Sequence, residues 1–140
     1  MNTADARKII VDRWIQKAEE ALASANLEMM HGHYAFSVNR LYYAAFYAVS
    51  ALLAQSGQEY GRHSAVRASL HRDFVKTGRV PVRFGALYDR LFSDRQEADY
   101  QPLRQFGEDD VVALTAETAE FVELLRRNIR SEFTATQPDQ

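Results

Sequence analysis

The sequence contains no cysteine, and it has no apolar run long enough to cross a membrane. The absence of cysteine excludes disulfide bonds and thiolate metal sites, and it leaves the redox compartment unmarked. The unbroken apolar stretch from Leu41 to Ala54 falls short of the roughly 20 residues that span a bilayer. The N-terminal segment carries Asp5, Asp12 and Glu19 among its apolar residues, which is not typical of a signal peptide. We therefore expect a cytoplasmic protein that has no contact with membranes.

Three sequence motifs that mark enzymes are also missing. There is no glycine-rich phosphate loop, no sharp turn that carries a nucleophilic serine, and no HExxH pair of metal-binding histidines. His31 and His33 flank a glycine, but no further metal ligands cluster near them in the sequence, so we interpret this segment as a loop. We expect neither a metal site nor a cofactor.

The pattern of apolar residues predicts one all-α domain. The length of 140 residues, with 46% hydrophobic and 26% charged residues, is typical of a single globular domain. Apolar residues recur at helical spacing in five segments, and no segment alternates as a strand does. Helices are predicted over residues 4–30, 34–56, 63–77, 81–101 and 108–130, so that residues 1–130 form the domain and residues 131–140 a polar tail. We expect Thr3 to cap the first helix, Ile10 to lie on its buried stripe, and Ser93 to mark a kink in the fourth.

The second predicted helix is apolar around nearly its whole circumference, which is typical of a central helix packed on several sides. Between His33 and Glu59 its only formally charged side chain is Arg40. Arg40 and Tyr43 lie along one side of this helix, and Asn39 lies next to them. Two interpretations remain open: Arg40 pairs with a carboxylate on a neighbouring helix, or these residues form a polar seam at the mouth of a groove.

Charge is unevenly distributed along the chain, although the net charge is only −2. From Gly61 to Arg83 there are six basic residues and one acid, a net charge of +5. From Glu108 to Glu123 there are six acids and no lysine or arginine. These stretches are either a basic face for an anion, two faces that meet in self-association, or two solvated helix faces.

Four sequence blocks, in the same order, resemble the HEPN domain (higher eukaryote and prokaryote nucleotide-binding). The blocks are SVNRLYYAAFYA at 37–48, HSAV at 63–66, FVKTG at 74–78 and RQEADY at 95–100. The resemblance covers roughly residues 10–129 and is closest to the small free-standing prokaryotic branch. It implies an up-and-down bundle of four to five helices that commonly dimerises. It also implies an adjacent nucleotidyltransferase, with which such proteins form toxin–antitoxin pairs.

Many members of this family are metal-independent RNases with an Arg-x(4–6)-His motif, in which arginine steadies phosphate and histidine helps the 2′-hydroxyl attack. Arg95 matches the arginine, but Tyr100 stands five residues on, and no histidine follows it. Tyrosine titrates near ~10 and histidine near ~6.5, so Tyr100 is a poor base at neutral pH. His63 could replace the missing base if the fold brings it beside Arg95. In related pairs the nucleotidyltransferase modifies a tyrosine near this motif, which makes Tyr100 a candidate acceptor.

The resemblance and the residues together predict a homodimer that binds nucleotide or RNA phosphate, works with a nucleotidyltransferase and lacks standard RNase activity. The candidate site is centred on the fourth and second helices, with His63 as a further candidate. It comprises Arg95, Asp99 and Tyr100 together with Arg40, Asn39 and Tyr43. Two alternatives are an RNase toxin with a non-standard base and a non-catalytic adaptor that binds another protein through the aromatic helix.

Overall fold

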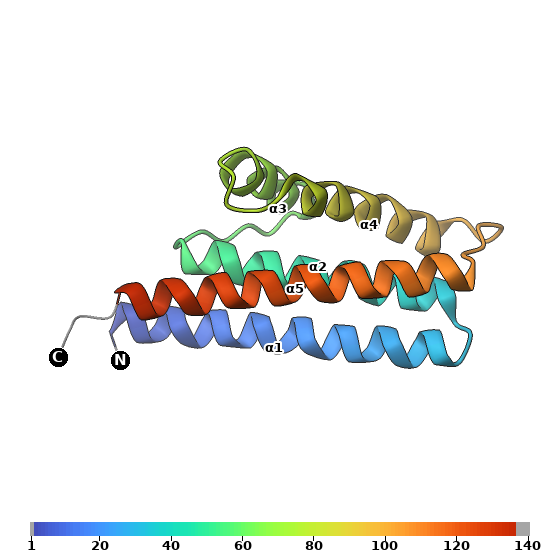
Figure 1. Ribbon diagram of the computed structural model, residues 1–140, viewed down its shortest axis with the longest axis horizontal. Coiled ribbons are helices and arrows are strands. Elements are labelled where there is room, and N and C mark those ends of the chain that lie inside the picture. The colour runs from blue at the N-terminus through green and yellow to red at the C-terminus, as the bar shows by residue number, and fades with distance from the viewer. Residues whose placement is uncertain (1, 137–140) are drawn as a thin grey trace.

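The computed structural model describes residues 2–136, which form an all-α bundle as expected. Within these residues there is no strand. The elements, in chain order, are α1 (Thr3–Met30), α2 (Tyr34–Gln55), α3 (His63–Ser69), a short π-helix η1 (Leu70–Val75), α4 (Val82–Tyr100) and α5 (Glu108–Thr136). Helices α1, α2 and α5 run side by side along the long axis, with α3 and α4 on one side of them (Figure 1). None of the described helices combines the length and hydropathy that crossing a bilayer requires.

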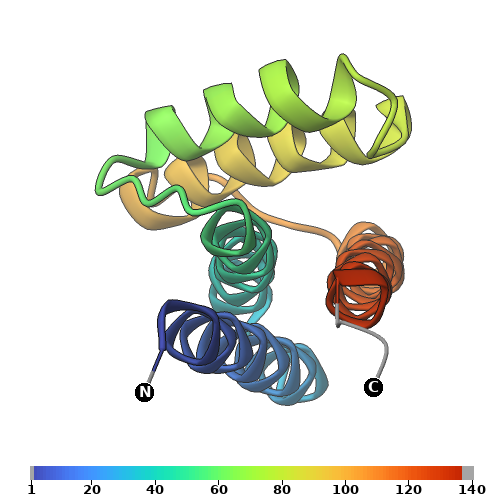
Figure 2. The ribbon, with the colours of Figure 1, turned by 90° about the vertical axis from the view of Figure 1, so that its left-hand side faces the viewer.

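Helix α2 is the centre of the bundle, as its apolar circumference predicted. It contacts α1 on one side, α5 on another and the α3–α4 pair on a third. The view along the bundle shows this arrangement end-on, with α3 and α4 lying side by side across α2 (Figure 2). Eleven residues of α2 are buried, including Tyr42 and Leu52. Burial of each large apolar side chain contributes roughly 1.5–3 kcal/mol, so the large side chains of α2 stabilise its contacts with these neighbours.

Two details of α1 differ from the prediction. Asn2, rather than Thr3, caps the helix, because its extended backbone lets its side-chain oxygen accept a hydrogen bond from Asp5 N at 2.8 Å. Ile10 is 51% exposed, whereas Val11 is fully buried. Both residues are β-branched and apolar, so periodicity alone could not decide which of the two faces α2.

Helix α4 is continuous, so the predicted kink at Ser93 is wrong. Two ion pairs between residues four apart stabilise the helix around this position. Arg90 pairs with Asp94 at 3.4 Å across Ser93, and Arg95 pairs with Asp99 at 2.9 Å in the next turn. Ser93 has the sequence spacing of a helix cap, but the ion pairs around it favour a continuous helix. Helix α5 continues to Thr136, so the predicted tail loses its first six residues to the helix, and 137–140 lie outside the described residues.

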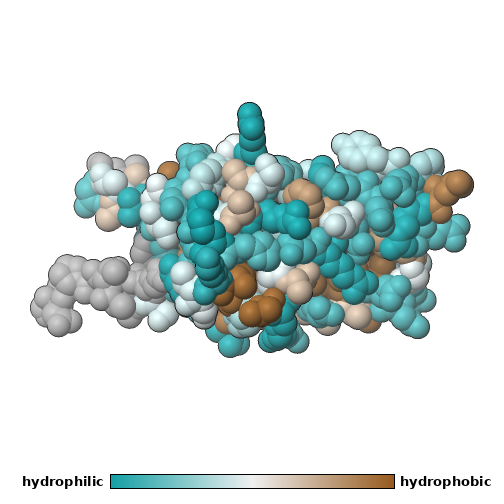
Figure 3. Space-filling model, turned by 90° about the horizontal axis from the view of Figure 1, so that it is seen from above, coloured by the Kyte–Doolittle hydropathy of each residue, from teal (hydrophilic) through white to brown (hydrophobic). Residues whose placement is uncertain are grey.

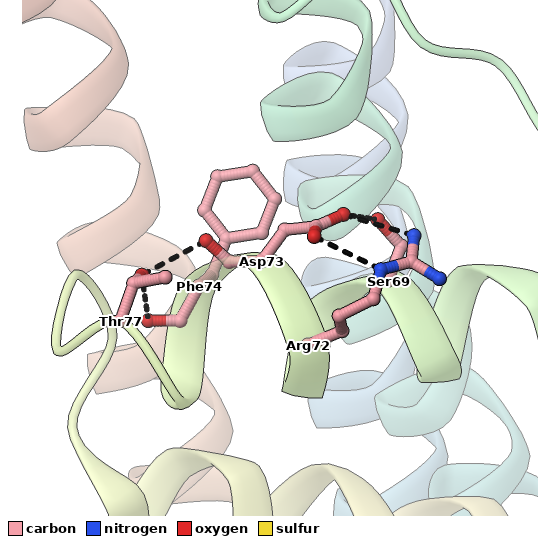
Figure 4. Close-up of polar contacts among 5 residues, drawn as sticks. All are labelled: Ser69, Arg72, Asp73, Phe74 and Thr77. Carbon is pink, nitrogen blue, oxygen red and sulfur yellow. Dashed lines mark hydrogen bonds and ion pairs between the residues drawn. The ribbon is translucent and has the colours of Figure 1, made fainter.

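The third predicted helix is present, but its second half is a π-helix, which the sequence pattern did not indicate. Phe74 from this segment points into the core, and Asp73 accepts hydrogen bonds from Ser69 and Arg72 (Figure 4). The hydroxyl of Thr77 donates to the carbonyl oxygens of Asp73 and Phe74, at 2.9 and 3.2 Å. Gly78 follows with a φ of 83°, a left-handed conformation that ends the helix.

Candidate functional site

Arg95 lies in the second half of α4 and turns toward the central helix. Its Nη2 donates a hydrogen bond to the hydroxyl of Tyr43 at 2.9 Å. The guanidinium carbon lies 5.5 and 5.3 Å from the ring centroids of Tyr42 and Tyr43, within the range of cation–π attraction. Only 19% of the Arg95 side chain is exposed. A cation is thus held against an aromatic wall, with a single carboxylate paired to it.

That carboxylate belongs to Asp99, one helical turn further along α4. Its Oδ2 lies 2.9 Å from Arg95 Nε in an ion pair, although the buried Nε–H is not aligned for a hydrogen bond. Asn39 Nδ2 donates to both Asp99 oxygens, at 3.0 and 3.3 Å, and Asn39 Oδ1 accepts from Arg40 Nη1 at 3.0 Å. A polar chain therefore joins Arg40 to Arg95 across α2 and α4.

Arg40 pairs with no carboxylate among the residues that the structure describes, so that interpretation of the sequence is wrong. Its guanidinium bonds the neighbouring Asn39 and lies 5.9 Å from the Phe36 ring. Arg40 also lines an open cavity of about 360 Å³ between α1 and α2, together with Lys17 and Tyr43. The polar seam at the mouth of a groove, the second interpretation, matches this geometry.

The fold brings His63 to the same cluster, from the start of α3. Its Nδ1 lies 2.9 Å from the hydroxyl of Tyr42, and its ring stacks on Phe46 with 4.3 Å between centroids. Burial and then the positive charge of Arg95 lower the pKa of His63 below its ordinary value. His63 is therefore a neutral imidazole at physiological pH, close to the guanidinium of Arg95.

Tyr42 belongs to this site, although the sequence analysis did not select it. Its side chain is fully buried, and burial raises the pKa of its hydroxyl. The signal was present in the sequence, because a tyrosine on an otherwise apolar buried helix needs a partner for its hydroxyl. Which partner it finds depends on α3, which is distant in the chain.

Tyr100 stands apart from the other candidate residues. It is the last residue of α4 and is 74% exposed. A separation of five residues turns it by roughly 140° around the helix relative to Arg95, so the two side chains leave different faces. The structure therefore gathers Arg95, Asp99, Asn39, Arg40, Tyr43 and His63, and it leaves Tyr100 at the surface.

A second polar cluster joins α3 and η1 to α4. Asp89 Oδ1 accepts from Arg67 Nε at 2.7 Å and lies 2.8 Å from His71 Nε2. Burial acts to raise the pKa of Asp89, but the hydrogen bonds of Arg67 and His71 outweigh it and hold the pKa below its usual value. The face that carries α3 and α4 is largely hydrophilic (Figure 3).

The basic stretch of the chain is partly neutralised by its own carboxylates. Arg67 pairs with Asp89 in this way, and Arg83 reaches Glu120 on α5 at 3.2 Å. The Arg83–Glu120 pair joins the basic and the acidic stretches within one chain. The net charge of +5 is therefore not wholly open to an external anion.

The protein is thus a small helical bundle in which the guanidinium of Arg95 lies against aromatic rings between α2 and α4. The chain belongs to the HEPN domain family, whose model matches residues 11–128. It is 42% identical over 102 residues to "UPF0332 protein" of Thermotoga maritima, covering 73% of this chain and 77% of that protein. It is 30% identical over 112 residues to "Putative toxin MJ0142" of Methanocaldococcus jannaschii, covering 80% and 71% of the two chains.

Proposed function

We propose that this HEPN protein binds the phosphate of a nucleotide or RNA at the Arg95 cluster and acts with a nucleotidyltransferase in a toxin–antitoxin-like pair. The observation that carries the proposal is the state of Arg95. Its guanidinium is mostly buried, yet its Nε–H has no hydrogen-bond acceptor, and one carboxylate balances its charge. A phosphate oxygen that approaches the exposed part of this guanidinium, where 19% of the side chain is accessible, would add a charge-assisted hydrogen bond.

The neighbouring residues have distinct roles in this proposal. Asp99, held by Asn39, orients the guanidinium of Arg95, and the hydroxyl of Tyr43 fixes its other end. Two cations, Arg40 and Lys17, and one acid, Glu20, line the cavity of about 360 Å³ beside Tyr43, and the excess positive charge would attract the following phosphate. His63, neutral because of burial and Arg95, adds a hydrogen-bonding group without adding charge.

Tyr100 would serve the partner enzyme rather than the phosphate site. Its exposed position at the end of α4 makes its hydroxyl accessible to a second protein. In the transfer, the hydroxyl oxygen attacks the α-phosphorus of a nucleoside triphosphate, pyrophosphate leaves, and the proton passes to a base of the nucleotidyltransferase. The toxin role is proposed by analogy with the M. jannaschii relative, whose name contains that word. We further propose that the protein is a cytoplasmic homodimer.

A second candidate function is metal-independent RNA cleavage with His63 as the base. The contacts of His63 and Arg95 favour RNA cleavage as the second candidate, because both side chains contact the same two tyrosines, Tyr42 and Tyr43. In this reaction His63 takes the proton of a 2′-hydroxyl and the oxygen attacks the adjacent phosphorus. The bond from phosphorus to the 5′-oxygen breaks, and that oxygen takes a proton from water to leave as a hydroxyl. Arg95 would stabilise the charge that develops on the phosphate.

The test combines RNA cleavage in EDTA with melting scans in the presence of nucleotide. Wild type is compared with Arg95→Ala and His63→Ala, and with Arg104→Ala, which removes an arginine that pairs with Glu97 outside the site. We expect no cleavage, together with a nucleotide-dependent rise in Tm that only the site variants lose. Cleavage that disappears in both site variants would establish the RNase instead. If the protein neither cleaves RNA nor gains Tm with nucleotide, the proposal fails, and the protein-binding adaptor is the function that remains.

A further inference from the structure

A large cavity lies at the end of the bundle where α1 begins and α2 ends. It has a volume of about 540 Å³, within the range of small-molecule sites. It is formed between the first half of α1, the last turns of α2 and the segment that connects α2 to α3 (Figure 1). Of the residues in the Arg95 cluster, only His63 lines it. The function proposed above therefore leaves this cavity without a role.

The wall of the cavity is mostly apolar, and it is rich in aromatic rings. Trp14 comes from α1, Phe46 from α2, Tyr60 from the connecting segment and His63 from the start of α3. The rings of Phe46 and His63 stack with 4.3 Å between their centroids. A further aromatic ring would bury apolar surface here and would gain face or edge contacts with these rings. The wall therefore suits a ligand that carries an aromatic side chain.

Two opposite charges also line the cavity, Arg7 from α1 and Glu59 from the connecting segment. Arg7 Nη2 lies close over Gly57, where an added Cβ would meet it at 3.3 Å. Glu59 follows Gly57 by two residues, so the Cα atoms of these two residues are at most about 7.6 Å apart. Arg7 and Glu59 are exposed, and neither forms an ion pair or a hydrogen bond with another residue of the described chain. One cation and one carboxylate are therefore open to a ligand at the same side of the cavity.

This pair of charges selects against ligands that carry a net charge. An anion is attracted by Arg7 but repelled by Glu59, and a cation experiences the reverse. A ligand that has both a carboxylate and an ammonium group can form charge-assisted hydrogen bonds with both side chains. An α-amino acid carries these two groups on one carbon atom, next to its side chain.

We infer that this cavity binds a free aromatic α-amino acid in its zwitterionic form. The carboxylate of the ligand pairs with Arg7, its ammonium group pairs with Glu59, and its ring lies against the aromatic wall. The inference does not depend on the proposed phosphate site, because Arg95 does not line the cavity.

L-phenylalanine is the probe, because it does not absorb at the wavelength that excites tryptophan. Equilibrium dialysis measures its binding. Fluorescence of Trp14, the only tryptophan of the chain, reports whether it binds in the cavity that Trp14 lines. Two analogues each lack one charged group: phenethylamine has no carboxylate, and 3-phenylpropionate has no ammonium group.

Wild type is compared with Arg7→Gln and Glu59→Gln, which each remove one of the two charges. The matched controls are Arg13→Gln and Glu117→Gln, which remove the same charges at exposed positions that do not line the cavity. Circular dichroism and Tm establish that each variant is folded.

We expect L-phenylalanine to bind and to change Trp14 fluorescence in a saturable way, and each analogue to bind about tenfold more weakly. Arg7→Gln and Glu59→Gln should each weaken L-phenylalanine binding about fivefold or more, and the two controls should remain within about twofold of wild type. Absence of L-phenylalanine binding in dialysis, or an unchanged Trp14 signal, would overturn the inference. Equal affinities for L-phenylalanine and both analogues would also overturn it.

The analogues separate a contact with the ligand from a structural role of the same side chain. Arg7→Gln should weaken binding of L-phenylalanine but not of phenethylamine, which has no carboxylate for Arg7 to bind. Glu59→Gln should weaken binding of L-phenylalanine but not of 3-phenylpropionate, which has no ammonium group. If Arg7→Gln weakens L-phenylalanine and phenethylamine by the same factor, Arg7 does not bind the carboxylate and the inference fails.

Discussion

The hydrogen bond between Tyr42 and His63 should couple the central helix to α3. Tyr42→Phe removes only the hydroxyl, which lies 2.9 Å from His63 Nδ1. A neutral hydrogen bond contributes about 0.5–1.5 kcal/mol, and a partner left without a bond adds to the loss. His63 is half-buried, so water can partly satisfy its nitrogen. We therefore expect Tyr42→Phe to lower the free energy of unfolding by about 1 kcal/mol, or roughly 3 °C in Tm.

Urea unfolding of Tyr42→Phe, His63→Ala and the double variant forms a double-mutant cycle that isolates this contact. The matched control is Tyr34→Phe on the same helix, because the Tyr34 hydroxyl forms no hydrogen bond within the described part of the chain. We expect a coupling energy of about 1 kcal/mol and a loss below about 0.5 kcal/mol in the control. A coupling energy indistinguishable from zero would refute the contact, and with it the placement of His63 beside Arg95.

Three further predictions concern pH and the backbone. The pKa of Asp89 is depressed in the folded protein, so its pairing stabilises the fold at pH above the ordinary carboxyl pKa, and this stability is lost as pH falls through the depressed pKa. Asp89→Asn should therefore destabilise the protein by less than about 1 kcal/mol at pH 7, and the urea midpoints of the two proteins should converge as the pH falls below the ordinary carboxyl pKa. Gly78→Ala should cost about 1 kcal/mol or more in urea unfolding because φ is 83°, whereas Gly61→Ala, at a negative-φ position with open space, should be nearly neutral. NMR titration should place the pKa of His63 below about 6.5, and Arg95→Ala should raise it, since Arg95 disfavours the charged imidazole; an unchanged value would contradict their proximity.

Local pattern was sufficient to predict much of the fold. The apolar circumference of α2 predicted its central position, and apolar residues that recur at helical spacing in α5, including Leu114, Phe121 and Leu125, are buried. Arg95 and Asp99 stand four residues apart in the sequence, and they form an ion pair within one helical turn. These features depend on residues close together in the chain, where helical geometry fixes the distance.

The remaining features depend on packing between distant segments. His63 meets Tyr42 and Arg95 only because α3 and α4 cross α2 together, and no sequence spacing reports that crossing. The π-helix η1 contacts both α3 and α4, and no sequence spacing indicated it. The candidate residues could therefore be listed from the sequence, but the fold was needed to separate a partly buried cluster from the exposed Tyr100.

The most direct test of the central claim is the affinity of a short single-stranded RNA for wild type and Arg95→Ala, measured by fluorescence anisotropy in EDTA. If Arg95 binds phosphate, Arg95→Ala should weaken binding by about tenfold or more, and Arg104→Ala should change it by less than about threefold. Equal affinities of wild type and a folded Arg95→Ala would contradict the account.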